Sequence, residues 1–203
     1  MKIHSESFEN GARIDPQYAA GAREGESVGF GGNRNPHLAW SDVPDGTQSF
    51  SLLCIDPDVP TDAAPHPIPR DQPRTDFIHW AMVDIPADVT DIAAGACSDG
   101  FEKGGKAAPK GPAGARQGIN SYTAYFAGNP AMAGTYRGYD GPYPPPHDER
   151  LHRYAFRVFA LDVAKLDVAD DFEAADVLRA MQGHVLGEAS VHGVYSLNAA
   201  VRD

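Results

Sequence analysis

Short apolar runs separated by turn residues are the dominant pattern along this chain. Leu38–Trp40, Phe50–Ile55 and Phe77–Ile85 are apolar segments of strand length. Within Tyr154–Leu161 one alternating face is wholly apolar and the other nearly so, which predicts a strand covered on both sides. Tyr122–Phe126 is a weaker strand candidate. The 21 glycines and 17 prolines are concentrated between these runs, a distribution typical of an all-β domain.

A helical period is convincing only near the C-terminus. Asp170 is predicted to cap this helix, and Glu173 follows three residues later, as in a capping box. Ser190–Val201 is predicted to form the last strand. Leu178–Leu186 could pack internally or contact a second copy in a homodimer, and the sequence leaves both open. Apolar side chains recur at helical spacing up to Gly187, namely Val177, Leu178, Met181, Val185 and Leu186.

Two segments are predicted to be loops inserted into one domain that spans residues 1–203. Residues 61–76 contain four prolines and scattered charges, and they are interpreted as a surface loop. Residues 102–116 are rich in Gly, Ala, Lys and Pro, and a solvated flexible loop is favoured over a lid on a pocket. This second loop contains the main cationic concentration of the chain, formed by Lys103, Lys106, Lys110 and Arg116.

Composition narrows the classes of partner. The formal net charge of −11 argues against nucleic acid and anionic membrane surfaces as general partners. The start lacks the apolar region of a signal peptide, and no apolar stretch approaches the roughly 20 residues that span a bilayer. Cys54 lies between Leu53 and Ile55, so it is interpreted as a small buried hydrophobe. We therefore expect a cytoplasmic protein without stable membrane insertion.

Three polar clusters adjoin three of the predicted strands. Asp56 and Asp58 follow Phe50–Ile55, His79 lies inside the next run, and His152 directly precedes Arg153 and Tyr154. A β core can bring such separated segments together, and carboxylates with imidazoles there would form an anion pocket. Two interpretations of Asp56 stay open: it orients an imidazole and selects its tautomer, or it is an ordinary turn carboxylate.

The histidines also have two interpretations. His79 is flanked by apolar residues, and a satisfied core histidine is the commoner outcome for such a position. His152 lacks the spacing of a metal-binding motif, so no metal and no cofactor are predicted. Between them, the segment from Gly141 to Pro146 is rigid and irregular. It is either a pocket wall, with the Gly141 N–H offered to a ligand, or a plain polyproline linker.

Taken together, these segments resemble the phosphatidylethanolamine-binding protein family, which includes the Raf kinase inhibitor proteins, and its bacterial branch most of all. The resemblance extends from about Phe8 to Leu197, and the combination of motifs is highly specific. The motifs, in family order, are Asn35–Trp40, Asp56–Pro60 (DPDVP), His79–Pro86 (HWAMVDIP), Gly138–Pro145 (GYDGPYPP) and His152–Phe156 (HRYAF).

The resemblance implies a mainly β fold, namely a two-sheet antiparallel β-sandwich with a Greek-key element and a C-terminal helix. It also implies a cavity for phosphate, phosphoryl headgroups or similar small anions. Phe77 stands where some relatives carry Trp on the pocket rim, and Tyr195 in the last strand is a further candidate. Carried over position by position, the cavity residues would be Asp56, His79, Gly141, Pro142, His152 and Tyr154.

The chain departs from the family pattern in two places. The family usually has a glycine between the proline pair and the HRY triplet, whereas this chain has Pro146–Leu151, which lengthens and acidifies the wall. The insertion at residues 61–76 precedes His79, where it could narrow or gate the mouth of the pocket. Both departures bear on the size and affinity of the ligand.

The function expected from the sequence is a non-enzymatic binding or regulatory protein with a small anion pocket. An imidazole, the Gly141 amide and the Tyr154 hydroxyl would be the donors, and protonated histidines would tighten binding below about pH 6.5. One alternative is a hydrolase or metal-dependent enzyme that uses His79, His152 and Asp56. Another is an inhibitor of a kinase or protease, with a protein partner that the sequence does not identify.

Overall fold

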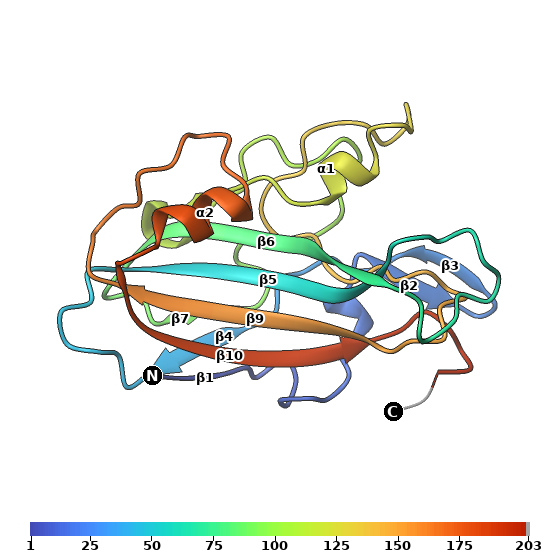
Figure 1. Cartoon of the computed structure of the whole chain (residues 1–203), viewed down its shortest axis with the longest axis horizontal. Helices are drawn as coiled ribbons and strands as arrows, with labels where there is room; N and C mark the ends of the chain where they lie inside the picture. The colour runs from blue at the N-terminus through green and yellow to red at the C-terminus, as the bar shows by residue number, and fades with distance from the viewer. Residues whose placement is uncertain (202–203) are drawn as a thin grey trace.

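The computed structural model describes residues 1–201, which form a mainly β fold with antiparallel sheets (Figure 1). The strand order is β10-β9-β5-β6-β8 in a five-stranded sheet, β1-β4-β7 in a three-stranded sheet and β2-β3 in a two-stranded sheet. Among the described residues, no helix is long and apolar enough to cross a membrane. The strands are β1 (Lys2–His4), β2 (Gly21–Glu24), β3 (Ser27–Phe30), β4 (Leu38–Ser41), β5 (Ser49–Pro60), β6 (Arg74–Pro86), β7 (Asp91–Ile92), β8 (Arg116–Gln117), β9 (His152–Leu161) and β10 (Val185–Tyr195), and the helices are α1 (Tyr122–Tyr125) and α2 (Ala174–Ala180).

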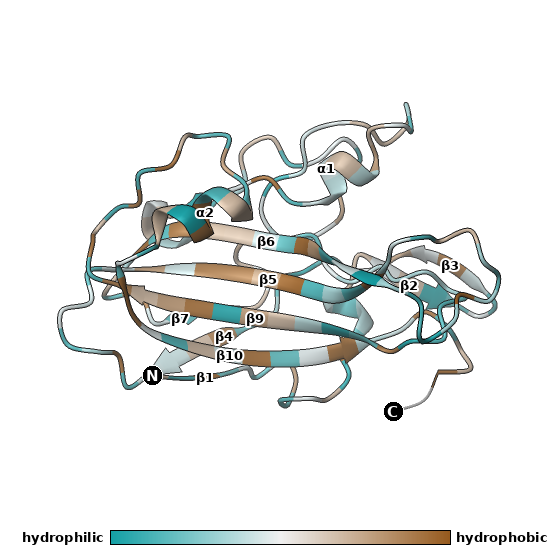
Figure 2. Cartoon of the chain, in the orientation of Figure 1, coloured by the Kyte–Doolittle hydropathy of each residue, from teal (hydrophilic) through white to brown (hydrophobic). Residues whose placement is uncertain are grey.

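The five-stranded sheet is apolar on both faces, as the long apolar runs predict. On one face Phe50 and Leu52 of β5 belong to a core cluster with Trp40 of β4, and the Trp40 and Phe50 rings lie 5.2 Å apart. On the other face Leu53 belongs to a second cluster with Val177 of α2. Figure 2 shows the hydrophobic centre of β5 and the hydrophilic segment that follows it. The two-sheet sandwich and the Greek-key element remain predictions.

The strand predictions around the site are confirmed, but β5 is longer than expected. It continues through Asp56 and Asp58 to Pro60, with irregular pairing to β6 between Asp56 and Val59. Both carboxylates are fully buried within the strand. They are therefore not ordinary turn carboxylates at the surface.

One predicted element is of the wrong type. Tyr122–Phe126 is not a strand: Tyr122–Tyr125 forms the short helix α1. Aromatic residues favour strands on average, but here Tyr122 and Phe126 lie one helical turn apart and stack their rings at 5.6 Å.

The C-terminal helix exists but is shorter than predicted. Glu173, not Asp170, is its N-cap, and the capping box pairs Glu173 with Asp176. The helix ends at Ala180, and the last strand begins at Val185 and ends at Tyr195, so its predicted range of Ser190–Val201 is shifted. Val185 pairs with Leu161 of β9, so backbone pairing in the sheet outweighed the helical spacing of these apolar residues.

Candidate ligand-binding site

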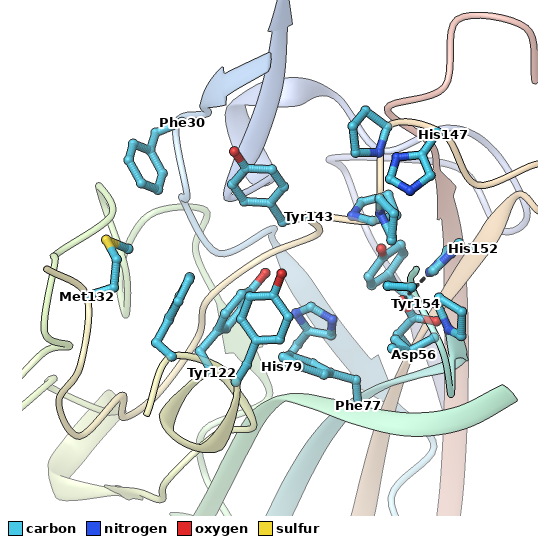
Figure 3. Close-up of a pocket in the computed structure, with 18 residues that line it drawn as sticks. Phe30, Asp56, Phe77, His79, Tyr122, Met132, Tyr143, His147, His152 and Tyr154 are labelled. Carbon is cyan, nitrogen blue, oxygen red and sulfur yellow. Dashed lines mark hydrogen bonds and ion pairs between the residues drawn. The ribbon is translucent and has the colours of Figure 1, made fainter. Parts of the chain in front are cut away.

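A cavity of about 500 Å³ lies where β5, β6 and β9 approach α1 and the proline segment 144–146. Strand β5 lies between β6 and β9, with Asp56 opposite Phe77 and Ile55 opposite Ala155. This adjacency brings together motifs that are almost 100 residues apart in the chain. Aromatic side chains form the largest group among the 18 lining residues (Figure 3), namely Phe30, Phe77, Tyr122, Tyr125, Phe126, Tyr143 and Tyr154.

The cavity has one polar end, formed by four of the predicted site residues. Asp56 of β5, His79 of β6, and His152 and Tyr154 of β9 all line it. Figure 3 shows Asp56, His152 and Tyr154 grouped together, with His79 beside them. Phe77 also lines the cavity, its ring 5.0 Å from that of His79.

His152 is held between two carboxylates. Its Nδ1 lies 2.7 Å from Asp56 Oδ2, and its Nε2 lies 3.1 Å from Asp148 Oδ2. Carboxylates only accept hydrogen bonds, so both ring nitrogens carry protons and the ring is an imidazolium. Burial opposes this charge, but the hydrogen bonds to Asp148 and Asp56 outweigh it and raise the pKa of His152 to about 9. Asp56 thus orients an imidazole, as one interpretation of the sequence expected.

Asp148 connects His152 to Arg74, at the start of β6. The guanidinium donates to both carboxylate oxygens of Asp148, at 2.5 and 3.1 Å, and 6 % of the Arg74 side chain is exposed. Burial disfavours the carboxylate, yet hydrogen bonds from His152 and Arg74 lower the pKa of Asp148 to about 2. The neighbouring carboxylate of Asp58 accepts in the same way from Arg153, at 2.8 and 3.1 Å.

His79 has a different environment. Its Nδ1 lies 2.7 Å from the backbone oxygen of Asp140, which only accepts, so Nδ1 carries the proton. In the neutral ring Nε2 is therefore an acceptor, and within residues 1–201 it forms no hydrogen bond. Burial lowers the pKa of His79 below its ordinary value of 6.5, although Asp56 and Asp140 act against this shift. His79 is neutral at pH 7.

The Tyr154 hydroxyl is buried and forms no hydrogen bond of normal geometry in the described part of the chain, although the Asp56 carboxylate lies near enough to interact with it. Burial, followed by the charge of Asp56, raises the pKa of Tyr154 well above its usual value. The group therefore remains an O–H donor at any ordinary pH. A buried hydroxyl that lines a cavity without a partner is a polar group available to a ligand.

Three predicted site residues do not line the cavity. The Gly141 amide donates to Asn33 Oδ1 at 2.8 Å, so it is not free for an anion. A Cβ on Gly141 would lie 2.2 Å from the Tyr18 carbonyl oxygen, which gives this glycine a packing role. Pro142 is buried and its carbonyl accepts from the Gly21 amide, while the Tyr195 hydroxyl donates to the Gly21 carbonyl at 2.8 Å.

The sequence did not identify several residues that build the site. Asp148 lies in the acidified wall, but its carboxylate was not assigned to His152. Lys106 is buried against Asp140 at 2.5 Å, which contradicts a solvated role for this part of the 102–116 loop. Ala63 of the 61–76 insertion lines the cavity, so this loop does reach the mouth. No local pattern marks Asp148, because residues 148–151 are not helical and a spacing of four residues there predicts no contact.

Within residues 1–201, no group of three or more His, Cys, Asp or Glu side chains is arranged to hold a metal ion. The cavity offers a ligand the unpaired Nε2 atoms of His79 and His147, the Tyr154 hydroxyl and a large aromatic surface. This arrangement can hold a molecule that is polar at one end and apolar along its body.

The chain is similar to known proteins along almost its whole length. The family model described as phosphatidylethanolamine-binding protein matches residues 4–196. UPF0098 proteins from Methanothermobacter thermautotrophicus and Escherichia coli (YbhB) are 33% and 31% identical, over 96% and 97% of this chain and 98% and 100% of theirs.

Solved structures agree with these sequence comparisons. The crystal structure of YbcL from Escherichia coli, described as a new member of the mammalian PEBP family, superposes with a TM-score of 0.69 at 30% identity and covers 96% of this chain and 97% of that one. The homologue CT736 from Chlamydia trachomatis gives 0.66 at 27% identity, covering 96% of each chain. The chain belongs to the phosphatidylethanolamine-binding protein family.

Proposed function

We propose that this protein binds a small amphipathic molecule in the cavity without transforming it. Membership of the family suggests a binding protein. The observation that supports the cavity as the site is the buried Tyr154 hydroxyl without a partner in the described chain, beside the free Nε2 of His79. The ligand's polar group would meet these two atoms, and its apolar body would lie among the aromatic rings.

When Nε2 of His79 is protonated, the expected ligand is an anion that carries a phosphoryl, carboxylate or sulfate group, as in a phospholipid headgroup. Tyr154 is one donor for this group, and His79 becomes a second only when Nε2 is protonated. Hydrogen bonds to charged groups contribute about 1.5–3 kcal/mol each, but desolvation and ordering oppose them. We therefore expect Kd values in about the millimolar to micromolar range, with tighter binding below about pH 6.5.

The enzymatic alternative needs an imidazole that can take and release a proton. Both nitrogens of His152 are engaged by carboxylates, whereas His79 and His147, which also line the cavity, each keep Nε2 without a hydrogen bond within residues 1–201. No serine, threonine or cysteine lines the cavity within residues 1–201 to serve as a nucleophile beside these rings, which favours the non-enzymatic proposal. Inhibition of a kinase or protease remains an expectation from the family resemblance, since no feature of the cavity identifies a protein partner.

Titration calorimetry with phosphoethanolamine and phenyl sulfate at pH 5.5 and 8 tests the proposal. Phenyl sulfate keeps one charge over this range, so a change in its affinity reports on the protein. We expect tighter binding at the lower pH in the wild type and in His4→Gln, an exposed control, and no such gain in His79→Gln. Equal affinity at both pH values would contradict the proposal. So would an NMR titration in which the saturable chemical-shift changes fall on residues outside the cavity.

A further inference from the structure

The carboxylate of Asp148 occupies the position from which an external anion would bind His152. It accepts from His152 Nε2 at 3.1 Å and from both terminal nitrogens of Arg74. Assuming the proposed binding function, we propose that Asp148 is a built-in anion that closes this side of the cavity to external anions. The polar group of the ligand at neutral pH is then uncharged, with a hydrogen-bond donor beside an acceptor.

The backbone holds Asp148 in this position from several directions. Its N–H donates to the Pro145 carbonyl at 3.1 Å, and its carbonyl accepts from the Asn198 side chain at 2.9 Å. Its Oδ1 also accepts the Arg150 amide at 2.8 Å. Ile68 of the 61–76 insertion exchanges backbone hydrogen bonds with His147 and Glu149 on either side. The carboxylate is thus part of the folded wall.

Charge balance gives the physical reason for the selectivity. Asp56 and Asp148 supply two negative charges, and His152 and Arg74 supply two positive charges. No lysine or arginine lines the cavity within residues 1–201. An incoming carboxylate or phosphate would be a third anion in a desolvated end with no cation left to pair with it, which is costly.

Besides His147, which lines the cavity from the proline wall, a ligand meets one acceptor and one donor group. His79 Nε2 accepts, the Tyr154 hydroxyl donates, and the two rings lie 5.1 Å apart in an edge-on arrangement. A primary carboxamide or an alcohol supplies the complementary donor and acceptor. An aromatic body on the same molecule would lie between Tyr143 on one side and Tyr122 on the other (Figure 3).

At acidic pH, protonation of His79 reverses the preference for an uncharged ligand over an anion. The charged groups that face its ring are Asp56 of β5, Asp140 of the segment before the proline wall and His152 of β9. Tyr122 of α1 and Tyr154 of β9 contact it edge-on and stay neutral. Protonation converts Nε2 into a donor and adds a positive charge, so the neutral ligand loses its acceptor and an anion gains a partner.

Benzamide and benzoate form a matched probe pair, because they share shape and differ in charge. Calorimetry at about pH 7.5 is expected to show benzamide binding at least about tenfold more tightly than benzoate to the wild type. In Asp148→Ala, which frees His152 and Arg74, benzoate affinity should rise by at least about tenfold. Glu149→Gln is the matched control, since it removes one exposed charge from the next residue and should behave as wild type.

Asp148→Ala also has a readout that does not need a cavity ligand. Formate fits the space of the lost carboxylate, so it should raise the melting temperature of Asp148→Ala more than chloride at equal ionic strength, but not that of wild type or Glu149→Gln. Asp148→Asn keeps the size of the side chain and should respond less. Equal affinity of wild type for both probes at pH 7.5, or no formate effect, would overturn the inference. If neither probe binds wild type, the proposed function fails, and the formate result alone decides the role of Asp148.

Discussion

Lys106 Nζ lies 2.5 Å from Asp140 Oδ1 in an ion pair that is almost fully buried. The same carboxylate accepts from the side chains of Asn33 and Asn120, each at 2.8 Å. The backbone oxygen of Asp140 accepts the Nδ1 proton of His79. Asp140 therefore fixes the histidine through its backbone, while three other side chains fix Asp140.

Replacing Lys106 by Met should destabilise the fold, because it leaves the Asp140 carboxylate buried without its cation. Losing one member of a buried ion pair costs about 3–5 kcal/mol, so we expect a loss of this order in the free energy of unfolding from urea denaturation. Lys103→Met, on the same loop but exposed, should change it little. A stable Lys106→Met with an unchanged His79 environment would contradict this role of Asp140.

The His152 imidazolium should make stability fall as pH rises above neutrality. Its pKa is about 9 in the folded chain and about 6.5 when unfolded, so the contribution is complete below 6.5 and is lost as pH rises through 9. The difference corresponds to at most about 3 kcal/mol. Urea denaturation between about pH 6 and 9.5 should show this decline in wild type and not in His152→Gln. A decline of equal size in both would assign it to other groups.

Binding of an anion should raise the pKa of His79, whereas burial lowers it. Burial holds it below 6.5 in the free protein, and the unfolded chain therefore takes up this proton first as pH falls, which lowers stability below 6.5. An anion that pairs with protonated Nε2 must raise the His79 pKa by linkage. NMR titration of the His79 ring with and without phenyl sulfate measures this shift, and the exposed His4 ring serves as control. An unchanged midpoint for His79 would exclude the contact.

The sequence predicts which residues meet at the site, but it does not predict how their charges are balanced. Strong apolar runs identify β5, β6 and β9, and their motifs predict that Asp56, His79, His152 and Tyr154 share one cavity. The sequence does not predict the role of Asp148, because its contact with Arg74 depends on how an inserted loop pairs with the proline wall. Hydrogen-bond partners of that kind are tertiary and leave no periodic trace.

Other errors have the same origin. The Gly141 amide looked available because glycine allows a close approach, but Asn33, more than 100 residues earlier, already accepts from it. The helix around Val177 was extended too far, because Val185 satisfied the helical spacing and also a place in β10. In both cases a contact with a residue distant in the sequence determined the local structure and outweighed the local pattern.

Tyr154 and Tyr195 form a matched pair that separates ligand binding from folding. The Tyr195 hydroxyl donates to the Gly21 carbonyl at 2.8 Å, whereas that of Tyr154 has no partner within residues 1–201. Tyr195→Phe should therefore lose about 1 kcal/mol of stability and keep wild-type affinity, because it removes one satisfied hydrogen bond outside the cavity. Tyr154→Phe should unfold at the same urea concentration as wild type or a higher one, yet bind benzamide about fivefold to tenfold more weakly. If Tyr154→Phe destabilises the protein as much as Tyr195→Phe and leaves affinity unchanged, the Tyr154 hydroxyl serves the fold and not the ligand.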